Sequence, residues 1–183
     1  MPNHTTNILT VDGPQQQIDE MKRFVKSVDE NGQEMLFSLA AVIPMPAELV
    51  GTVSGSESCK PEWQKQNSEQ LIAKYGADEW YHWCIQNWET KWDAYDYKEW
   101  DGNMLRFCTA WSPPRPVIQA LSKKFPELTF RLQYADEGWG YVGETTFAGG
   151  AVIGEEYLRD YKLPEFVEMY EEITGRNIAE EEE

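Results

Sequence analysis

Apolar side chains recur along most of this chain every two residues or every three to four, the spacings of a strand and of a helix. Helical spacing is found in four segments, namely residues 15–28, 63–75, 117–125 and 163–175. Strand alternation or a short apolar run is found in five, namely residues 7–11, 35–43, 104–110, 128–134 and 141–153. Glycine and proline separate these segments, so the pattern predicts a chain of mixed helices and strands.

Two segments connect the first half of the chain to the second. Residues 35–43 are nearly all apolar, which predicts a strand in the centre of a sheet. Residues 48–61 are rich in Gly and Ser, which predicts either a mobile loop or a seam between two structural halves.

The stretch from residue 80 to residue 116 holds most of the tryptophans of the chain. Asp78 is the expected N-cap of a helix that frays near residues 87–90 and is followed by a loop. At about 100° per residue, four indoles fall within about half of the circumference of that helix. These are Trp80, Trp83, Trp88 and Trp92. Since a wide aromatic face must be buried, we expect these rings to form core.

The predicted order of elements is β-α-β, two helices, β-α-β-β and a last helix. A strand, a crossover helix and a strand, found twice, is typical of ferredoxin-like domains. We therefore expect an α+β fold, with helices on one face of a mostly antiparallel sheet and a tryptophan-rich helical insertion. Residues 1–178 are expected to form a single domain, and residues 179–183 a disordered acidic tail.

Two motifs carry a resemblance to a known family. Residues 87–95, NWETKWDAY, resemble the NWGTKWNA segment of the Api92-like (YubB-like, DUF1281) proteins of phages, plasmids and other bacterial mobile elements. Residues 111–122, WSPPRPVIQALS, resemble the same family's TPWSPP..VI..LS run, and the resemblance extends over residues 36–150. It implies a ferredoxin-like C-terminal part and a mobile-element origin, and it carries over no activity. Glu89 stands where the family usually has Gly, a departure that bears on the turn there.

The net charge of −16, from 32 acidic and 16 basic residues, narrows the choice of partners. A field of this sign repels nucleic acid and anionic membranes and attracts basic proteins. No apolar run approaches the roughly 18 residues of a membrane span, and no signal pattern opens the chain. Three widely spaced cysteines, Cys59, Cys84 and Cys108, favour reduced thiols and hence a cytoplasmic location.

No arrangement of residues predicts catalysis, a metal or a cofactor. On a helix His82 and Cys84 would point about 200° apart, so they cannot share one ion. The acidic residues between 93 and 101 lack the spacing and the glycine of a calcium loop. The glycines between 138 and 150 do not open a helix after a strand, as phosphate loops do, so they predict turns and bulges.

We therefore expect a non-enzymatic mobile-element protein that binds and inhibits a host factor. The specific hypothesis is a counter-defence inhibitor, of the anti-CRISPR or anti-restriction type. Its acidic surface would occupy the nucleic-acid-binding site of a basic host protein or nucleoprotein complex, without binding nucleic acid itself. The expected contact residues are exposed carboxylates: Asp93, Asp96, Glu99, Asp101, Asp136, Glu137, Glu165, Glu168, Glu171 and Glu172. The alternatives are a small-ligand-binding protein or enzyme with a tryptophan-lined pocket, and a plain structural or oligomerisation role.

Overall fold

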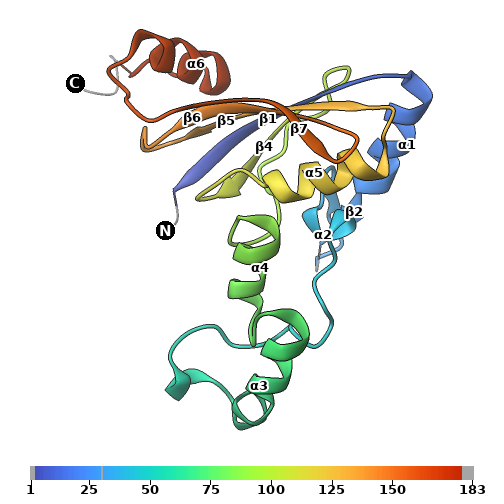
Figure 1. Ribbon diagram of the computed structural model, residues 1–183, viewed down its shortest axis with the longest axis vertical. Coiled ribbons are helices and arrows are strands. Elements are labelled where there is room, and N and C mark those ends of the chain that lie inside the picture. Colours follow the sequence, from blue (N-terminus) through green and yellow to red (C-terminus); the bar gives the residue numbers. More distant parts are fainter. Residues whose placement is uncertain (1–2, 30, 179–183) are drawn as a thin grey trace.

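A five-stranded sheet in the order β4-β1-β5-β6-β7 is the centre of the computed structural model, which describes residues 3–29 and 31–178. Every neighbouring pair of strands in it is antiparallel. The strands are β1 (His4–Asp12), β4 (Met104–Ala110), β5 (Thr129–Asp136), β6 (Val142–Ala148) and β7 (Ala151–Leu158). Helices α1 (Gln15–Val25) and α5 (Arg115–Lys124) lie on one face of the sheet, and α6 (Pro164–Thr174) lies on the other (Figure 1).

The mixed α+β class and the antiparallel sheet are confirmed. Strands β4 and β5 flank β1 on its two sides, so the connection through α5 crosses over an intervening strand. Alternation places Phe130, Leu132 and Tyr134 of β5 on the side of α5, in the larger of two apolar cores. The β6–β7 hairpin turns at Gly149 and Gly150, whose φ angles of 57° and 85° confirm a turn for this pair of glycines.

The prediction that the helices cover one face of the sheet is wrong for α6. Its inward side chains, Phe166, Tyr170 and Ile173, form a second core on the opposite face, with Ile8 and Val142 among the strand residues. Strand β1 is apolar on both sides, because Leu9 and Val11 face the first core while Ile8 faces the second. A sheet with two apolar faces needs a cover on each.

The prediction of a central strand over residues 35–43 is also wrong. Only Glu34–Met35 is extended, as β3, and it pairs with β2 (Ser27–Val28) in a separate two-stranded sheet. Leu39–Val42 forms a single helical turn, α2. Phe37 and Leu39 are fully buried, so the apolar run does enter the core. A short apolar run fits a buried strand and a buried helical turn equally well.

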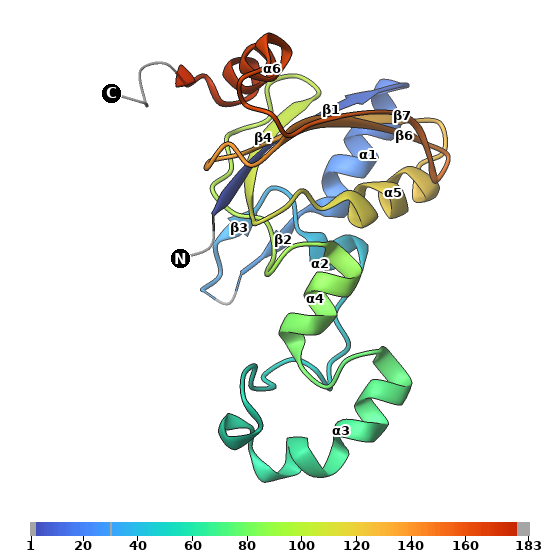
Figure 2. The same ribbon diagram turned by 60° about the vertical axis from the view of Figure 1, so that its left-hand side comes forward.

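A helical lobe projects from the sheet and is reached through α4 (Figure 2). It contains a short 3-10 turn (Glu57–Cys59) and α3 (Glu62–Tyr75), and α4 (Trp80–Trp88) connects it to the rest of the molecule. Residues 48–61 enter this lobe with Leu49 and Thr52 buried, and the alternatives of a loop or a seam there stay predictions. In the part of the chain that the structure describes, no helix has the length and apolar content to cross a membrane.

Candidate functional site

The carboxylates expected to contact a partner lie in three places, which are the loop before β4, the turn after β5, and helix α6. Their environments differ so strongly that only some of them are available to a partner. The predicted tail, residues 179–183, lies outside the described residues.

Asp93 is a structural residue, so its assignment to an exposed contact surface is wrong. Its carboxylate accepts hydrogen bonds from Ser38 Oγ at 2.8 Å and from the backbone N–H of Leu39 at 2.6 Å and Ala40 at 3.3 Å. It thereby caps α2, whose first N–H groups have no partner within the helix. Burial raises the pKa of Asp93 by more than these hydrogen bonds lower it.

Asp136 is likewise buried and turned inward, which corrects its assignment to the exposed surface. Its Oδ2 accepts hydrogen bonds from the N–H groups of Gly138 and Gly140, at 3.2 and 3.1 Å. The half-buried Glu137 accepts a 2.7 Å hydrogen bond from the N–H of His4. Both carboxylates thus hold the turn after β5 against the start of β1.

The loop before β4 displays Asp96, Glu99 and Asp101, all of which are exposed. Its backbone pairs with β4 at Tyr95 and at Asp101. Lys98 is part of the same loop, and its N–H bonds to the carbonyl of Arg106. A basic residue therefore stands among the three acids, and the surface of this loop is not of one charge sign.

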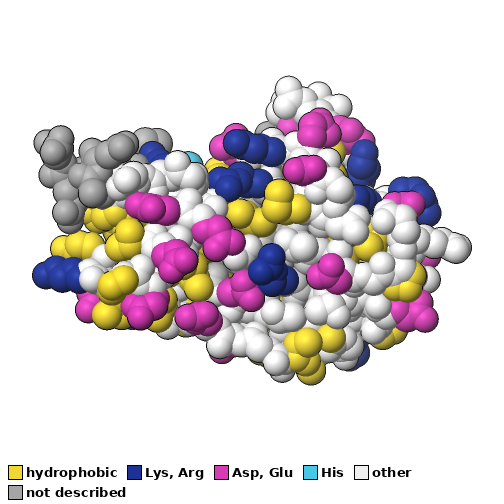
Figure 3. All heavy atoms as spheres, turned by 90° about the horizontal axis from the view of Figure 1, so that it is seen from above, with side chains coloured by type: hydrophobic (Ala, Val, Ile, Leu, Met, Phe, Trp, Pro, Cys, Tyr) yellow, Lys and Arg dark blue, Asp and Glu magenta, His cyan; other side chains and the backbone are white. Residues whose placement is uncertain are grey.

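Helix α6 carries the most uniform acidic surface. Glu165, Glu168 and Glu172 are exposed and spaced by three and four residues, so they share one side of the helix; we call these three the α6 stripe. Acidic side chains gather over this helix when the molecule is viewed from the α6 side (Figure 3). Within residues 3–29 and 31–178, none of the three forms an ion pair with Lys, Arg or His.

Two further carboxylates on the same face of the sheet escaped the sequence analysis. Val142 of β6 faces α6, so Glu144, two residues on, lies on that face as well. Glu156 of β7 lies directly opposite Glu144 in the strand register. The sequence of β7, AVIGEEYL, has no alternation that would assign Glu156 to a face, and the residue opposite Glu156 depends on long-range pairing.

The four tryptophans expected to form one aromatic face differ in burial. Trp83 and Trp88 are buried in the core with their rings 5.4 Å apart, as expected. Trp80 is half-buried, and Trp92 is 37% exposed, beyond the end of the helix. The expected single aromatic face is therefore correct for two rings and wrong for Trp92, because α4 ends at Trp88.

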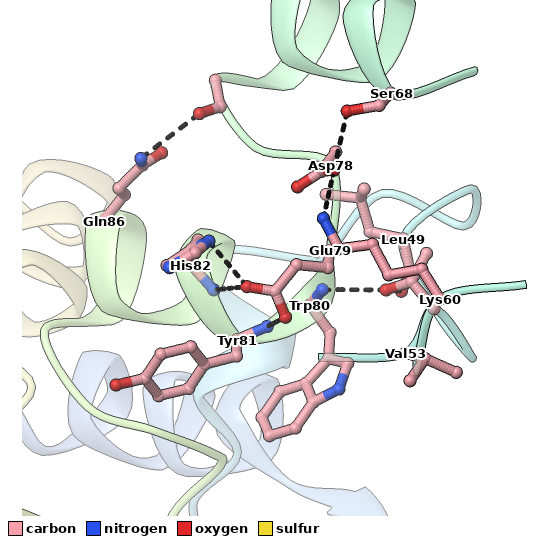
Figure 4. A network of polar contacts seen from close by, with 12 residues as sticks. Leu49, Val53, Lys60, Ser68, Asp78, Glu79, Trp80, Tyr81, His82 and Gln86 are labelled. Carbon is pink, nitrogen blue, oxygen red and sulfur yellow. Dashed lines mark hydrogen bonds and ion pairs between the residues drawn. The ribbon is translucent and has the colours of Figure 1, made fainter. Parts of the chain in front are cut away.

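The lobe is held to α4 by a buried polar network (Figure 4). Glu79, not Asp78, is the N-cap of α4, and its carboxylate accepts from the N–H groups of Tyr81 and His82. Asp78 points the other way, to Lys60 Nζ and Ser68 Oγ, each at 2.7 Å. Although burial raises the pKa of Asp78, these hydrogen bonds hold it below its usual value. The ion pair between Lys60 and Asp78 stabilises the lobe.

A hollow of about 350 Å³ lies beside α5 and is lined by tyrosines, Tyr134, Tyr141 and Tyr157 among them. Arg115 borders it and is bound to Glu89 at 3.0 Å and to Glu155 at 3.3 Å. Gly143 of β6 forms part of the sheet beneath the hollow. A Cβ added at Gly143 would lie 2.8 Å from the Tyr134 ring, so the close packing of this ring requires glycine there. In the described ranges, no group of three or more His, Cys, Asp or Glu side chains is placed to hold a metal ion.

The three cysteines differ in their reactivity as nucleophiles. Burial raises the pKa of Cys84 to about 12 and that of Cys108 to about 11. Cys59 is exposed, and hydrogen bonds with Ser56 and Ser58 lower its pKa.

Because the thiolate is the reacting form, Ellman's reagent at pH 8 is expected to modify the Cys59 thiol at least ~100-fold faster than the other two thiols. Cys59→Ser should remove the fast phase, and two fast thiols in the native protein would contradict this ranking.

Glu89, at the position of the family's glycine, keeps the glycine-type turn. It ends α4 with φ 62° and ψ 4°, the left-handed conformation that glycine adopts without steric cost. The departure therefore does not change the turn. It adds a carboxylate, which pairs with Arg115 across to α5.

Substitution of Glu89 separates the cost of the turn from the gain of the ion pair. Glu89→Gly relieves about 1 kcal/mol of backbone strain and loses an ion pair of similar value, so the free energy of unfolding should change little. Glu89→Ala keeps the strain and loses the ion pair, so it should be the less stable variant by about 1 kcal/mol. Urea denaturation measures the difference, and an alanine variant at least as stable as the glycine variant would contradict it.

A comparison with known protein families agrees with this architecture. Residues 87–175 match the model of a family described as a ferredoxin-like domain in Api92-like protein. The region therefore is a ferredoxin-like domain, as expected from the order of elements. Both motifs lie within the matched residues, so the match confirms their resemblance to the Api92-like family.

One solved structure is similar to the chain, the crystal structure of a protein api92 from Yersinia pseudotuberculosis. The sequence identity is 11% and the TM-score is 0.48, over 87% of this chain and 99% of that chain. No curated protein matches the chain.

Proposed function

We propose that this protein is a non-enzymatic inhibitor that binds a basic host protein or nucleoprotein complex through the α6 stripe. The hypothesis places it in the cytoplasm of a bacterial host, as the product of a phage or plasmid that counters CRISPR or restriction machinery. The basic nucleic-acid-binding sites of such machinery are complementary in charge to a chain of net charge −16.

The observation that carries the proposal is where α6 places its glutamates. Glu171 and Glu172 lie in the last turn, close to the negative end of the helix dipole, and that turn contains no basic residue of its own. Arg106 of β4 donates a hydrogen bond to the carbonyl of Thr174 at this end. Glu168 and Glu172 are like charges four residues apart, and their repulsion destabilises the helix by about 0.2–0.5 kcal/mol. The acids in the last turn and the Glu168–Glu172 pair oppose helix formation, so contact with a positive partner is the better explanation of them.

The contact surface is narrower than the set of ten carboxylates. It consists of the α6 stripe and Glu171, together with Glu144 and Glu156 on the same face of the sheet. Asp93 and Asp136 are excluded because their oxygens are occupied inside the fold.

Affinity capture from a lysate of the bacterial host, at low and at high salt, tests the proposal. We expect a basic protein or nucleoprotein to be held at low salt and released at high salt, because exposed charge pairs are screened. The variant E165Q/E168Q/E172Q should lose the capture. The variant E20Q/E69Q/E127Q, which removes the same charge from exposed sites elsewhere, should keep it. Capture that ignores salt, or that survives loss of the stripe, would contradict the proposal.

The hollow beside α5 supports a second candidate function, binding of a small ligand. Tyrosines rather than tryptophans line it, and Tyr141 and Tyr157 stack with ring centroids 5.9 Å apart. A ligand seated there would quench tyrosine emission or shift the signals of these rings. If a small molecule binds in this hollow, and if the variant E165Q/E168Q/E172Q leaves the capture from lysate unchanged, this second function is favoured over the first.

A further inference from the structure

The two edges of the five-stranded sheet are protected unequally. Beyond β4, the loop of residues 95–101 pairs with the strand, with hydrogen bonds of 3.0 and 2.7 Å between Tyr95 and Cys108. Beyond β7, the sheet has no further strand among the residues that the structure describes. Every residue from 151 to 157 is exposed. An uncovered edge strand is a template for pairing with another chain.

Strand β7 also lacks most of the features that prevent such pairing. Its sequence, AVIGEEYL, contains no lysine and no proline. Its one irregularity is a shift of register where β6 passes from Thr146 to Phe147, near the hairpin turn. Val152 and Ile153 are 49% and 61% exposed, so the edge offers apolar side chains as well as backbone groups.

The charges on the α6 side of the sheet indicate which charge an added strand beside β7 would carry. Arg131 of β5 lies 3.4 Å from Glu144 of β6, and Glu144 lies opposite Glu156 of β7. Like charges directly opposite one another disfavour a strand pair. Glu156 has no ion pair with any described residue. A lysine or arginine on a next strand would complete this row of charges.

The face toward α5 provides room for the other side chains of such a strand. The tyrosine hollow and a second hollow of about 290 Å³ share Arg115 and Glu155, so together they follow β7. Val152 borders one of them and Tyr157 the other. Since side chains of a strand alternate between faces, every second residue of an added strand would reach this groove.

We propose that β7 takes up an extended basic segment of the partner as a sixth strand. Lysine or arginine at alternate positions would face Glu156, and apolar side chains between them would enter the groove beside α5. The basic character of the partner rests on the proposed function, and the binding mode is additional to it. A second copy of this chain is the poorer occupant. If two β7 strands paired around residues 155 and 156, glutamates of one copy would face glutamates of the other, which is destabilising.

Binding of a synthetic peptide in which lysine alternates with valine tests the inference on the full chain. Hydrogen–deuterium exchange of the β7 amides is measured with this peptide and with its fully backbone-N-methylated form, which has the same charge and no N–H donors. We expect slower β7 exchange with the first peptide only. Glu156→Lys should weaken binding roughly threefold or more. Glu69→Lys, the same charge change on the exposed side of α3, should leave it within about twofold.

The other outcomes overturn the inference. Equal binding of both peptides without protection of β7 would mean that the acidic field attracts them and the edge does not pair. Slower β7 exchange of the protein alone at higher concentration would identify a second copy as the occupant. Loss of salt-dependent capture in E165Q/E168Q/E172Q, with no β7 protection in any sample, would leave the proposed function standing and remove only this inference.

Discussion

Replacing Asp93 with alanine is expected to lower the free energy of unfolding by about 3 kcal/mol, because it leaves buried donors without an acceptor. The carboxylate takes the hydroxyl of Ser38 and the N–H groups of Leu39 and Ala40, and it also accepts from the N–H of Ala94 at 2.8 Å. Leu39 is fully buried, so water cannot replace the lost acceptor at that N–H. Urea denaturation followed by circular dichroism measures the loss.

Glu99→Ala is the matched control for this substitution, since Glu99 is an exposed acid of the same loop. It should change the free energy of unfolding by no more than about 0.5 kcal/mol. Asp93→Asn keeps one acceptor oxygen and should fall between the two. Equal effects of Asp93→Ala and Glu99→Ala would show that Asp93 is a surface acid, and would return it to the candidate contact residues.

Replacing Trp88 with alanine is expected to cost about 3–5 kcal/mol, the range for loss of a buried aromatic side chain. Trp88 is 3% exposed, packs edge-to-face on Trp83, and donates a 2.9 Å hydrogen bond to the carbonyl of Ile43. It therefore joins the end of α4 to the segment that follows α2. Thermal and urea unfolding of the variant measure the loss.

Two variants separate the parts of this effect. Trp88→Phe keeps a ring but loses the hydrogen bond to Ile43, so it should cost about 1–2 kcal/mol. Trp63→Ala removes an indole that is 47% exposed on the lobe, and it should cost about 1 kcal/mol or less. If Trp88→Ala proved as mild as Trp63→Ala, the aromatic stretch would not be core, and a ligand role for its tryptophans would be favoured again.

Local periodicity is enough to predict the strands and helices that have apolar residues on one side and polar residues on the other. The helical spacing of residues 163–175 predicts α6, and its glutamates are expected to be exposed. The structure has that arrangement for Glu165, Glu168 and Glu172, while Glu171 is half-buried. Strand β5 alternates and was predicted to within a few residues. In both elements, the burial of one side is visible in the order of the residues themselves.

The errors come from partners distant in the chain. The turn α2 takes helical form in residues predicted as a strand, capped by Asp93, which lies 54 residues beyond Leu39. Asp136 was expected at the surface because it is acidic, but it is buried, and one of the donors to its carboxylate is Asn3 at the start of the chain. The open edge at β7 follows from the order of strands in the sheet, which no local pattern determines.

The central claim, that the α6 stripe inhibits a basic host factor, is tested most directly by phage infection. The efficiency of plating is measured on bacteria that carry CRISPR or restriction machinery and express this protein, E165Q/E168Q/E172Q, or E20Q/E69Q/E127Q. The account predicts that the wild-type protein and the control variant restore plating, while the stripe variant lowers it roughly tenfold or more at equal protein level. Restoration of plating by the stripe variant to the wild-type level, or none by the wild-type protein, would contradict it.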